Sequence, residues 1–488
     1  MYLFVQLVEM VYDVYARYCN VPNSHVHFND ALRVKTVQGL GYLVQKNPRM
    51  LLKAQQDHTL QTMILHPDPK VRTQILASLT DLLQGEEARL EKLHATQGTK
   101  VGKDQVQGDQ EGDASLIGGV MQAQLPNMLK VATQKEASIR TQAIACIGLL
   151  LTQGLIAPMQ CIPTLVALET DQLASVRDTA YLHLVAIHSK FPNMVSGPAI
   201  QGIFSSYQFQ TRAFGKAIVC DTDNVCYLGR MYRTCIQGNR SQRHAFFNGL
   251  LGAFRERGPV FTALAANRLT PAVALGYLTY VAQVLSAMPY DVEDEPLYVV
   301  YTINRDVALG LGAVQDKVKK YLGDDTTLDN LPEPDAPIKP EVAAVGPTAF
   351  ALALLVRLKM ALKAAYGLDN ETCQTFQTSN TTKARMRYRT FRTRVYECVV
   401  VDVGQRNARI AHDGGPRLDF DPHERGRHND GGGGWDRHVE WMDTTQAPRR
   451  GRGPGPGAIG FRLGTPTTDQ EESQTTQARR PAQAKASE

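Results

Sequence analysis

Apolar and polar residues alternate with a helical period from the N-terminus to about Leu322, and the pattern restarts at intervals. Four restarts share a β-branched residue followed directly by a basic one: Val34-Lys35, Val71-Arg72, Ile139-Arg140 and Val176-Arg177. Val34 and Val71 are 37 residues apart, and so are Ile139 and Val176. A recurring period of this length predicts a repeat architecture.

Each period is long enough for two helices, which is typical of HEAT-type repeats. Such a unit cannot bury its apolar face alone, so neighbouring units stack and share one continuous core. The predicted fold class is all-α: a HEAT-repeat α-solenoid of stacked antiparallel helix pairs, with a disordered insertion and a disordered C-terminal tail. A solenoid favours a scaffold that grips other macromolecules over an enzyme with a pocket.

The spacing and the composition divide the chain into six segments. Arg72 and Arg140 are 68 residues apart, and a polar, Gly- and Gln-rich stretch between them accounts for the excess over one period. The predicted segments are 1–84, HEAT repeats truncated at the N-terminal side; 85–115, a polar disordered insertion; 116–322, HEAT repeats; 323–347, a Pro- and Asp-rich linker; 348–377, closing helices; and 378–488, an Arg/Gly/Pro-rich disordered tail.

The formal net charge of +5 comes from the tail. Residues 383–488 contain 19 Lys and Arg against 14 Asp and Glu, so residues 1–382 contain 34 of each and are neutral. Bulk charge therefore does not make the helical part a nucleic-acid binder, and any DNA contact there requires a local cluster. Within the tail, RMRYRTFRTR (385–394) interleaves basic and aromatic residues, a pattern that binds single-stranded nucleic acid. The alternative is a solvated tail without that role.

Sequence signatures of catalysis are missing. The chain has no GxxxxGK[ST], GxSxG or HExxH motif, which argues against an enzyme and against a catalytic metal. Eight cysteines are scattered without a CxxC pair, and Cys220, Cys226 and Cys235 form the one loose cluster. Metal binding and reduced thiols are the two interpretations of that cluster. The predicted protein uses no cofactor.

Two apolar stretches do not predict membrane spans. Residues 141–168 are uncharged, but Pro158 and Pro163 interrupt them, and residues 349–367 carry three basic residues. Both are expected to be packed helices of a protein that has no membrane partner.

Several blocks of sequence resemble the C-terminal region of the Nipped-B-type cohesin loaders, the sister chromatid cohesion protein family. The blocks are HPDPKVRTQILASLTDLLQGEE (66–87), CIGLLLTQGLIAPMQCIPTLVALETD (146–171), GRMYRTCIQGNRSQRHAFFNGLLGAF (229–254), MPYDVEDEPLYVVYTIN (288–304) and LLVRLKMALKAAYGLDN (354–370). The third block contains an NRxxRxxF core: Asn239, Arg240, Arg243 and Phe246. The resemblance covers about residues 1–370 and does not extend to the tail after Thr378.

The resemblance implies a hook-shaped HEAT solenoid in the nucleus that takes part in the cell cycle through sister chromatid cohesion. Proteins of this family load cohesin onto chromatin, bind the Smc heads, the kleisin subunit and DNA, and stimulate cohesin's ATPase without hydrolysing ATP. Their TPR-type loader subunit binds a far N-terminal region that is absent from this chain. The alternative is another HEAT-repeat adaptor, such as a nuclear-transport or phosphatase scaffold.

Four arginines are the candidate residues for binding DNA or a partner: Arg230, Arg233, Arg240 and Arg243. Arg240 and Arg243 are three residues apart and share a face if the segment is helical, where guanidinium groups suit phosphates or an acidic partner. Alternatively, Arg240 and Arg243 pair with nearby acids, for which Glu293, Asp294 and Glu295 are the candidates.

The repeated helix starts contain a second pattern of charges. Asp68 lies four residues before Arg72, and Glu136 lies four residues before Arg140. Neighbouring units could therefore stack acidic and basic side chains into a ladder, or each pair could be a solvated i,i+4 pair within its own unit.

Overall fold

A computed structural model describes residues 2–21, 29–96, 103–322 and 340–378. All of them lie in the first of two compact units, Met1–Asp419, whereas the second, Phe420–Glu488, lies outside the described residues. The described part is helical, and its one β-type pairing is a single bridge between Cys220 and Cys226. The predicted all-α repeat fold is confirmed.

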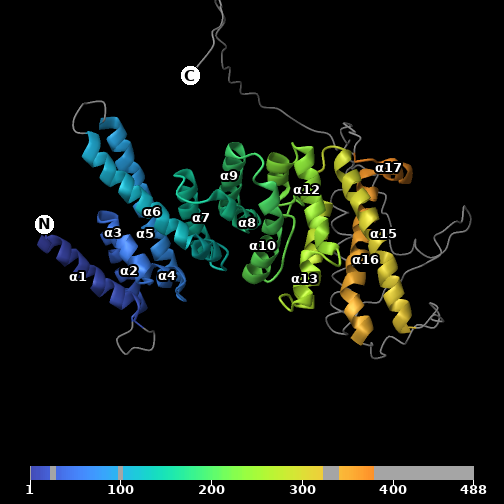
Figure 1. Ribbon diagram of the computed structural model, residues 1–488, viewed down its shortest axis with the longest axis horizontal. Helices are drawn as coiled ribbons and strands as arrows, with labels where there is room; N and C mark the ends of the chain where they lie inside the picture. Colours follow the sequence, from blue (N-terminus) through green and yellow to red (C-terminus); the bar gives the residue numbers. More distant parts are fainter. Residues whose placement is uncertain (1, 22–28, 97–102, 323–339, 379–488) are drawn as a thin grey trace, which may run out of the picture. The chain divides into compact units, whose positions relative to one another are not determined.

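The helices follow one another along the chain as labelled in Figure 1. Their bounds are α1 Tyr2–Cys19, α2 Asp30–Lys46, α3 Arg49–Gln56, α4 Thr59–Ile64, α5 Pro69–Thr96, α6 Lys103–Ala132, α7 Ala137–Thr152, α8 Pro158–Leu168, α9 Ala174–Lys190, α10 Ser196–Phe214, α11 Gly229–Met231, the π-helix η1 Tyr232–Ile236, α12 Arg240–Leu251, the 3₁₀ helix η2 Gly252–Phe254, α13 Pro259–Ala265, α14 Pro271–Ala287, α15 Asp294–Leu322, α16 Pro340–Tyr366 and α17 Asn370–Thr375.

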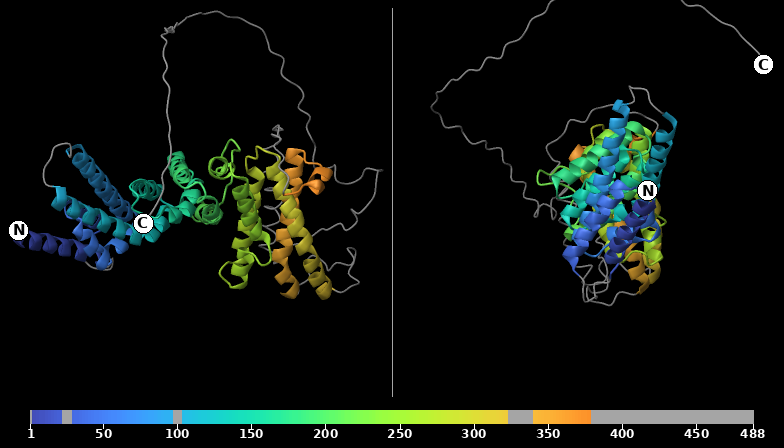
Figure 2. Two further views of the ribbon diagram at one scale, coloured as in Figure 1. Left: turned by 45° about the horizontal axis from the view of Figure 1, so that its top comes forward. Right: turned by 90° about the vertical axis from the view of Figure 1, so that its left-hand side faces the viewer.

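Two layers of helices make up the stack. In one layer α2 packs on α5, α5 on α7, and α7 on α9. In the other, α3 and α4 pack on α6, α6 on α8, α8 on α10, and α10 on α14. The left-hand view of Figure 2 shows the same succession along the chain. Each unit thus contributes one helix to each layer, which is the helix-pair arrangement that the 37-residue period predicts.

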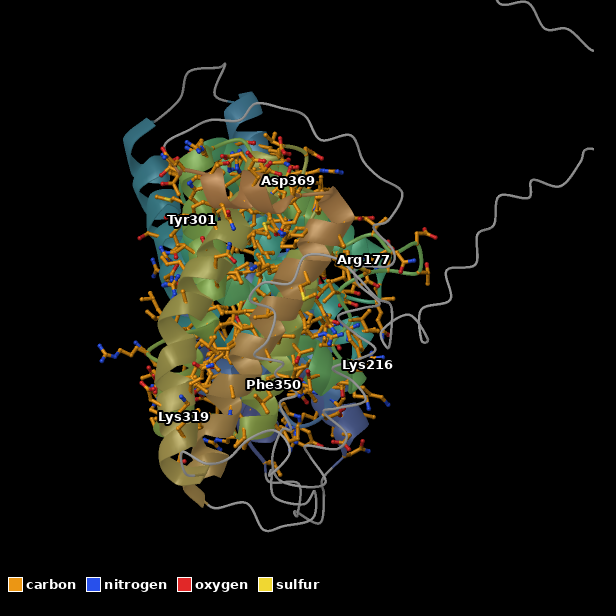
Figure 3. All side chains as sticks on the ribbon, turned by 90° about the vertical axis from the view of Figure 1, so that its right-hand side faces the viewer. Arg177, Lys216, Tyr301, Lys319, Phe350 and Asp369 are labelled. Carbon is orange, nitrogen blue, oxygen red and sulfur yellow. The ribbon has the colours of Figure 1, made fainter. Side chains whose placement is uncertain are left out.

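One continuous core of buried side chains runs from Tyr12 on α1 to Phe376 after α17. Figure 3 views the α15–α16 end, where Tyr301 lies on α15 and Phe350 on α16. The Tyr301 ring meets the Phe376 ring edge-on, with centroids 5.8 Å apart, so the residues after α17 close this end of the core.

Helix α16 is long and apolar enough over Val345–Tyr366 to span a membrane by length and composition alone. It packs against α14 and α15, and Leu354, Leu355 and Leu358 are buried in the shared core. The apolar face is therefore covered by protein, which is the packing expected of a core helix.

Two predicted segment boundaries are wrong. Helix α5 continues to Thr96 and α6 begins at Lys103, so most of the predicted insertion 85–115 is helical. Helix α16 begins at Pro340, inside the predicted linker 323–347. Helices extend cooperatively from a packed turn, and Gln, Glu and Lys are good helix formers, so a polar sequence can still continue a helix. The rest of the linker, 323–339, and the predicted tail from residue 379 lie outside the described residues.

Close helix approach in the second layer depends on Gly202 of α10. A Cβ atom at this position would lie 2.6 Å from Cβ of Val166 on α8, and neither atom is at the far end of a flexible side chain. Gly119 of α6 is the opposite case, because nothing lies within 4 Å of the Cβ position.

We expect Gly202→Ala to lower the free energy of unfolding by about 1–3 kcal/mol, because α8 and α10 must separate to admit the methyl group. The matched control Gly119→Ala should raise it by roughly 0.5–1 kcal/mol through helix propensity. Urea unfolding followed by circular dichroism measures both. Equal effects of the two substitutions would show that the α8–α10 contact does not depend on a glycine.

Candidate functional site: an arginine and carboxylate network between helix units

A buried ion pair links two successive units. Arg140 of α7 donates from Nη2 to Oδ1 of Asp171 at 2.9 Å and from Nε to the other carboxylate oxygen. Its Nη1 donates to the carbonyls of Gln134 and Lys135, in the turn before α7. Both charged side chains are almost fully buried, at 3% and 0% exposure. The guanidinium therefore ties the start of its own helix to the turn that precedes α9.

Related contacts occur in the preceding units. Arg72 of α5 lies 3.7 Å from Glu136, in the turn before α7. Arg33 of α2 is buried, and its Nη1 lies 2.7 Å from Nε2 of His66, in the turn before α5. The Arg72–Glu136 and Arg140–Asp171 contacts join a basic and an acidic side chain across units, as the ladder interpretation expects, whereas Arg33 contacts a histidine.

The sequence alignment of the repeats assigns the wrong residue to the first unit. It places Lys35 in register with Arg72, yet Lys35 is exposed and donates to Gln38 on the same helix. Arg33 takes the buried position instead. Residues two positions apart in an α-helix point about 200° apart around the helix axis. Only one of the side chains of Arg33 and Lys35 can therefore face the neighbouring unit.

The candidate arginine Arg230 reaches back to the preceding unit. From α11 its Nε donates to Oε1 of Glu169 at 3.0 Å, and its Nη1 donates to Oδ1 of Asp178 on α9 at 2.7 Å. The guanidinium also lies 4.6 Å from the centroid of the Tyr181 ring. Cation–π contact and two carboxylates together fix this side chain, although it remains 36% exposed.

The other three candidates reach forward to the segment before and at the start of α15. Arg233 donates to Oδ1 of Asp291 at 3.2 Å. Arg240 makes a bidentate pair with Asp294, at 3.1 and 2.9 Å. Arg243 donates to Asp294 at 3.2 Å and has its Nε 3.7 Å from Oε1 of Glu295. The structure therefore brings all four arginines into one charged network, but each contacts a carboxylate of the protein.

A π-helical turn separates the two directions of contact. Within η1 the amide of Gln237 donates to the carbonyl of Tyr232 at 2.9 Å, a five-residue step instead of the usual four. Arg230 precedes this turn, whereas Arg240 and Arg243 follow it. The insertion of a π turn leaves no clear mark in the sequence, so the different directions in which Arg230 and Arg240 reach could not be predicted from residue spacing.

The carboxylates of the network outnumber its arginines. Four arginines face five carboxylates: Glu169, Asp178, Asp291, Asp294 and Glu295. The sequence had pointed to Asp294 and Glu295 as partners of Arg240 and Arg243, and the structure places them there. It gave no indication of Glu169, Asp178 or Asp291, the partners of Arg230 and Arg233. The network is therefore not a positively charged surface.

Burial changes the protonation of two of these acids. It raises the pKa of Glu169 to about 7, although the Arg230 guanidinium opposes the shift. Burial also raises the pKa of Glu295. Burial alone would raise the pKa of Asp294 too, but the hydrogen bond and charge of Arg240 outweigh it and leave that pKa below its usual value.

His244 lies beside the same network. Its ring stacks on Tyr298 with centroids 3.7 Å apart, and its Nε2 is 3.6 Å from Asp294. Burial lowers the pKa of His244, and the neighbouring charges of Arg240 and Arg243 lower it further. Through its stack on Tyr298, this ring acts as a packing surface for α12 against α15.

Among the described residues no group of three or more His, Cys, Asp or Glu side chains is placed to hold a metal ion. Seven cysteines in this part are buried and held as thiols. Burial raises the pKa of the Cys235 thiol to about 12, and it contacts the carbonyl of Leu184. The loose cysteine cluster of the sequence is therefore not assembled into a three-ligand site.

Paired helices in two layers, with arginines that bridge successive units, define the protein as a HEAT-type helical-repeat fold. Residues 117–305 match a family model described as "Sister chromatid cohesion C-terminus". This part of the chain is therefore similar to the C-terminal region of the sister chromatid cohesion family.

Individual proteins that are similar to this chain are named Nipped-B-like proteins. The chain is 27% identical over 292 residues to the mouse (Mus musculus) Nipped-B-like protein, which covers 57% of this chain and 10% of the relative. It is 26% identical over 303 residues to the Caenorhabditis elegans Nipped-B-like protein scc-2, which covers 57% of this chain and 13% of the relative. The chain thus spans about a tenth of the length of these relatives.

A solved structure shares the fold. The C-terminal fragment of the Chaetomium thermophilum cohesin loader SCC2 superposes with a TM-score of 0.59 over 82% of this chain and 26% of that chain. Sequence identity is 15%, so this likeness shows the fold alone.

The buried pair of Arg140 and Asp171 yields a stability prediction. Asp171→Asn should lower the free energy of unfolding by about 3–5 kcal/mol, because it leaves the Arg140 charge buried without a counter-charge. The control Glu136→Gln removes the partner of Arg72, a longer and more exposed contact, and should change stability by no more than about 1 kcal/mol. Urea unfolding measures both. A loss below 1 kcal/mol for Asp171→Asn would show that the pair does not hold the units together.

A second prediction concerns pH. Since the folded-state pKa of Glu169 lies above the unfolded value, the folded state binds more protons between about pH 4.5 and 7. The stabilising effect of protonated Glu169 is complete below that pH window. It is lost as pH rises through the window, at up to about 1.4 kcal/mol per pH unit.

The test compares wild type with Glu169→Gln, which keeps a hydrogen-bond acceptor for Arg230 but cannot ionise. Urea midpoints at several pH values should show a difference in stability that changes across the window in favour of the variant as pH rises. A constant difference would mean that Glu169 does not titrate there.

Proposed function

We propose that this chain is a non-enzymatic scaffold that loads cohesin onto chromatin for sister chromatid cohesion in the nucleus. The observation that supports this most directly is the match of residues 117–305 to the sister chromatid cohesion family. The solved structure with the same fold is titled as a cohesin loader. The partners are the Smc heads and kleisin subunit of cohesin, together with DNA.

The exposure of the four arginines suggests a division of roles. Arg243 is 11% exposed and Arg240 is 27% exposed, and both hold α12 to the start of α15 through Asp294. Arg233 is 46% exposed, and its partner Asp291 is 40% exposed. Exposed ion pairs contribute little to stability, so Arg233 can exchange Asp291 for a phosphate or a partner carboxylate at small cost. Arg233, with Arg230 beside it, is therefore the proposed contact residue.

We expect Arg233→Glu in the full chain to weaken binding to DNA or to cohesin by about tenfold, because a rim charge that faces an anion is reversed. Asp291→Lys should instead strengthen binding to DNA, since it removes a competing carboxylate. Fluorescence anisotropy with labelled duplex DNA and with purified cohesin, repeated over a range of salt concentrations, measures both. If Arg233 contacts phosphate, its loss lowers the slope of log affinity against log salt by about one.

The charge swap Arg233→Asp with Asp291→Arg is the matched control, because it rebuilds the ion pair in reverse. If the pair serves only to hold η1 to the α14–α15 segment, the swap restores wild-type binding and wild-type melting temperature. If Arg233 contacts the partner, the melting temperature is restored while binding stays altered. Unchanged binding by all three variants would contradict the assignment of Arg233, and failure of the wild-type chain to bind cohesin would contradict the proposed function itself.

A further inference from the structure

Two cysteines face each other across a short hairpin that precedes α11. Cys220 and Cys226 form an antiparallel β-bridge. On either side of them, the amide of Asp221 donates to the carbonyl of Val225, and the amide of Tyr227 donates to the carbonyl of Val219, both at 3.0 Å. This pattern makes the cysteines a non-hydrogen-bonded pair, the closer of the two antiparallel arrangements, with Cα atoms about 4.5 Å apart.

The geometry of such a pair suits a covalent link. Directly opposed residues point to the same face of a ladder, with Cβ atoms about 4.5–5.5 Å apart. A disulfide needs Cα atoms about 4.4–6.8 Å apart and Cβ atoms about 3.5–4.5 Å apart. The pair therefore already has the required backbone separation, and about 1 Å of approach between the Cβ atoms completes it.

The loop between the cysteines is tightly built. Oδ1 of Asp221 accepts hydrogen bonds from the amides of Asp223 and Val225, at 3.0 and 2.8 Å, and Asn224 adopts a left-handed conformation with φ of 57°. These bonds keep the two strands in register, so the cysteines stay opposite each other. The residues from Thr222 to Val225 are exposed, and a small shift of this tip meets little packing resistance.

Other described cysteines lack such an arrangement. Cys146 lies within α7, Cys161 within α8 and Cys235 within η1, and burial raises the pKa of each to about 12. Because the described residues contain no three-ligand metal cluster, two facing thiols on a hairpin are suited to redox chemistry rather than to metal binding.

We propose that Cys220 and Cys226 form a reversible intramolecular disulfide. The co-reactant is a small disulfide such as glutathione disulfide: one protein thiolate attacks it and releases one glutathione thiol, and the second protein thiolate attacks the mixed disulfide and releases the other. Two protein thiols are oxidised to one disulfide, and one glutathione disulfide is reduced to two thiols. This site is separate from the proposed function.

Oxidation would affect the segment that leads into α11, the helix that contains Arg230. The carbonyl of Cys226 accepts a hydrogen bond from the amide of Gly229, the first residue of α11, at 3.0 Å. On the other side of the hairpin, the ring of Tyr227 lies 5.3 Å from the guanidinium carbon of Arg177, which Figure 3 labels. A disulfide closes the loop 221–225, restricts the unfolded chain and fixes the strand that leads into α11, next to Arg230.

The experiment incubates the folded full-length chain in glutathione buffers of increasing oxidised-to-reduced ratio. After an acid quench the protein is unfolded, alkylated and digested, and the peptides are identified by mass spectrometry. We expect a Cys220–Cys226 linked peptide that has lost two hydrogens and that disappears after dithiothreitol, while Cys146 and Cys161 stay alkylated. The yield should be unchanged in Cys235→Ala.

A second measurement tests whether the folded hairpin accommodates the bond. The oxidised protein should melt at a temperature several degrees above that of the reduced protein, and protease cleavage within residues 221–225 should slow. A glutathione adduct as the end product, full alkylation of both cysteines at every ratio, loss of the linked peptide in Cys235→Ala, or a lower melting temperature after oxidation would each overturn the proposal.

Discussion

The buried pair of Arg140 and Asp171 carries the constraint on which the stack depends. Apolar burial is non-directional, so a core of Leu, Ile and Val side chains alone would tolerate one unit sliding or turning against the next. Arg140 removes that freedom, because its five N–H groups need acceptors in fixed directions. The carboxylate of Asp171 and the carbonyls of Gln134 and Lys135 supply them. One side chain thus sets the position of α7 relative to two turns.

Arginine side chains also fix the positions of the units between α8 and α15, where they form a larger set of contacts. Arg230 binds Glu169 of the preceding unit, and Arg240 and Arg243 bind Asp294 of the following one, so three successive units share one charge network. Most of its carboxylates are buried and have arginine partners. The consequence is electrostatic as well as structural: positive charge that would attract a polyanion is neutralised within the protein, in keeping with the neutral total of residues 1–382.

The helices and their pairing could be predicted from the sequence, because apolar periodicity and a constant 37-residue spacing depend on local geometry. The sequence was less informative wherever the outcome depends on distant contacts. The repeat spacing selects Lys35, yet Arg33 takes the buried position, where it contacts His66 and the carbonyl of Val21. Glu169 could not be assigned to Arg230, because their contact depends on the path of the 61 residues of chain between them.

The residues that carry the family resemblance are explained by this architecture. In the NRxxRxxF core, Asn239 caps α12 by accepting from the amide of Gln242, Arg240 and Arg243 hold Asp294, and Phe246 is fully buried. The network from Glu169 to Glu295 lies within the matched segment 117–305. The residues that make the sequence recognisable are therefore those of the arginine and carboxylate network, which joins the units. The binding surface is expected among the partly exposed side chains beside this network.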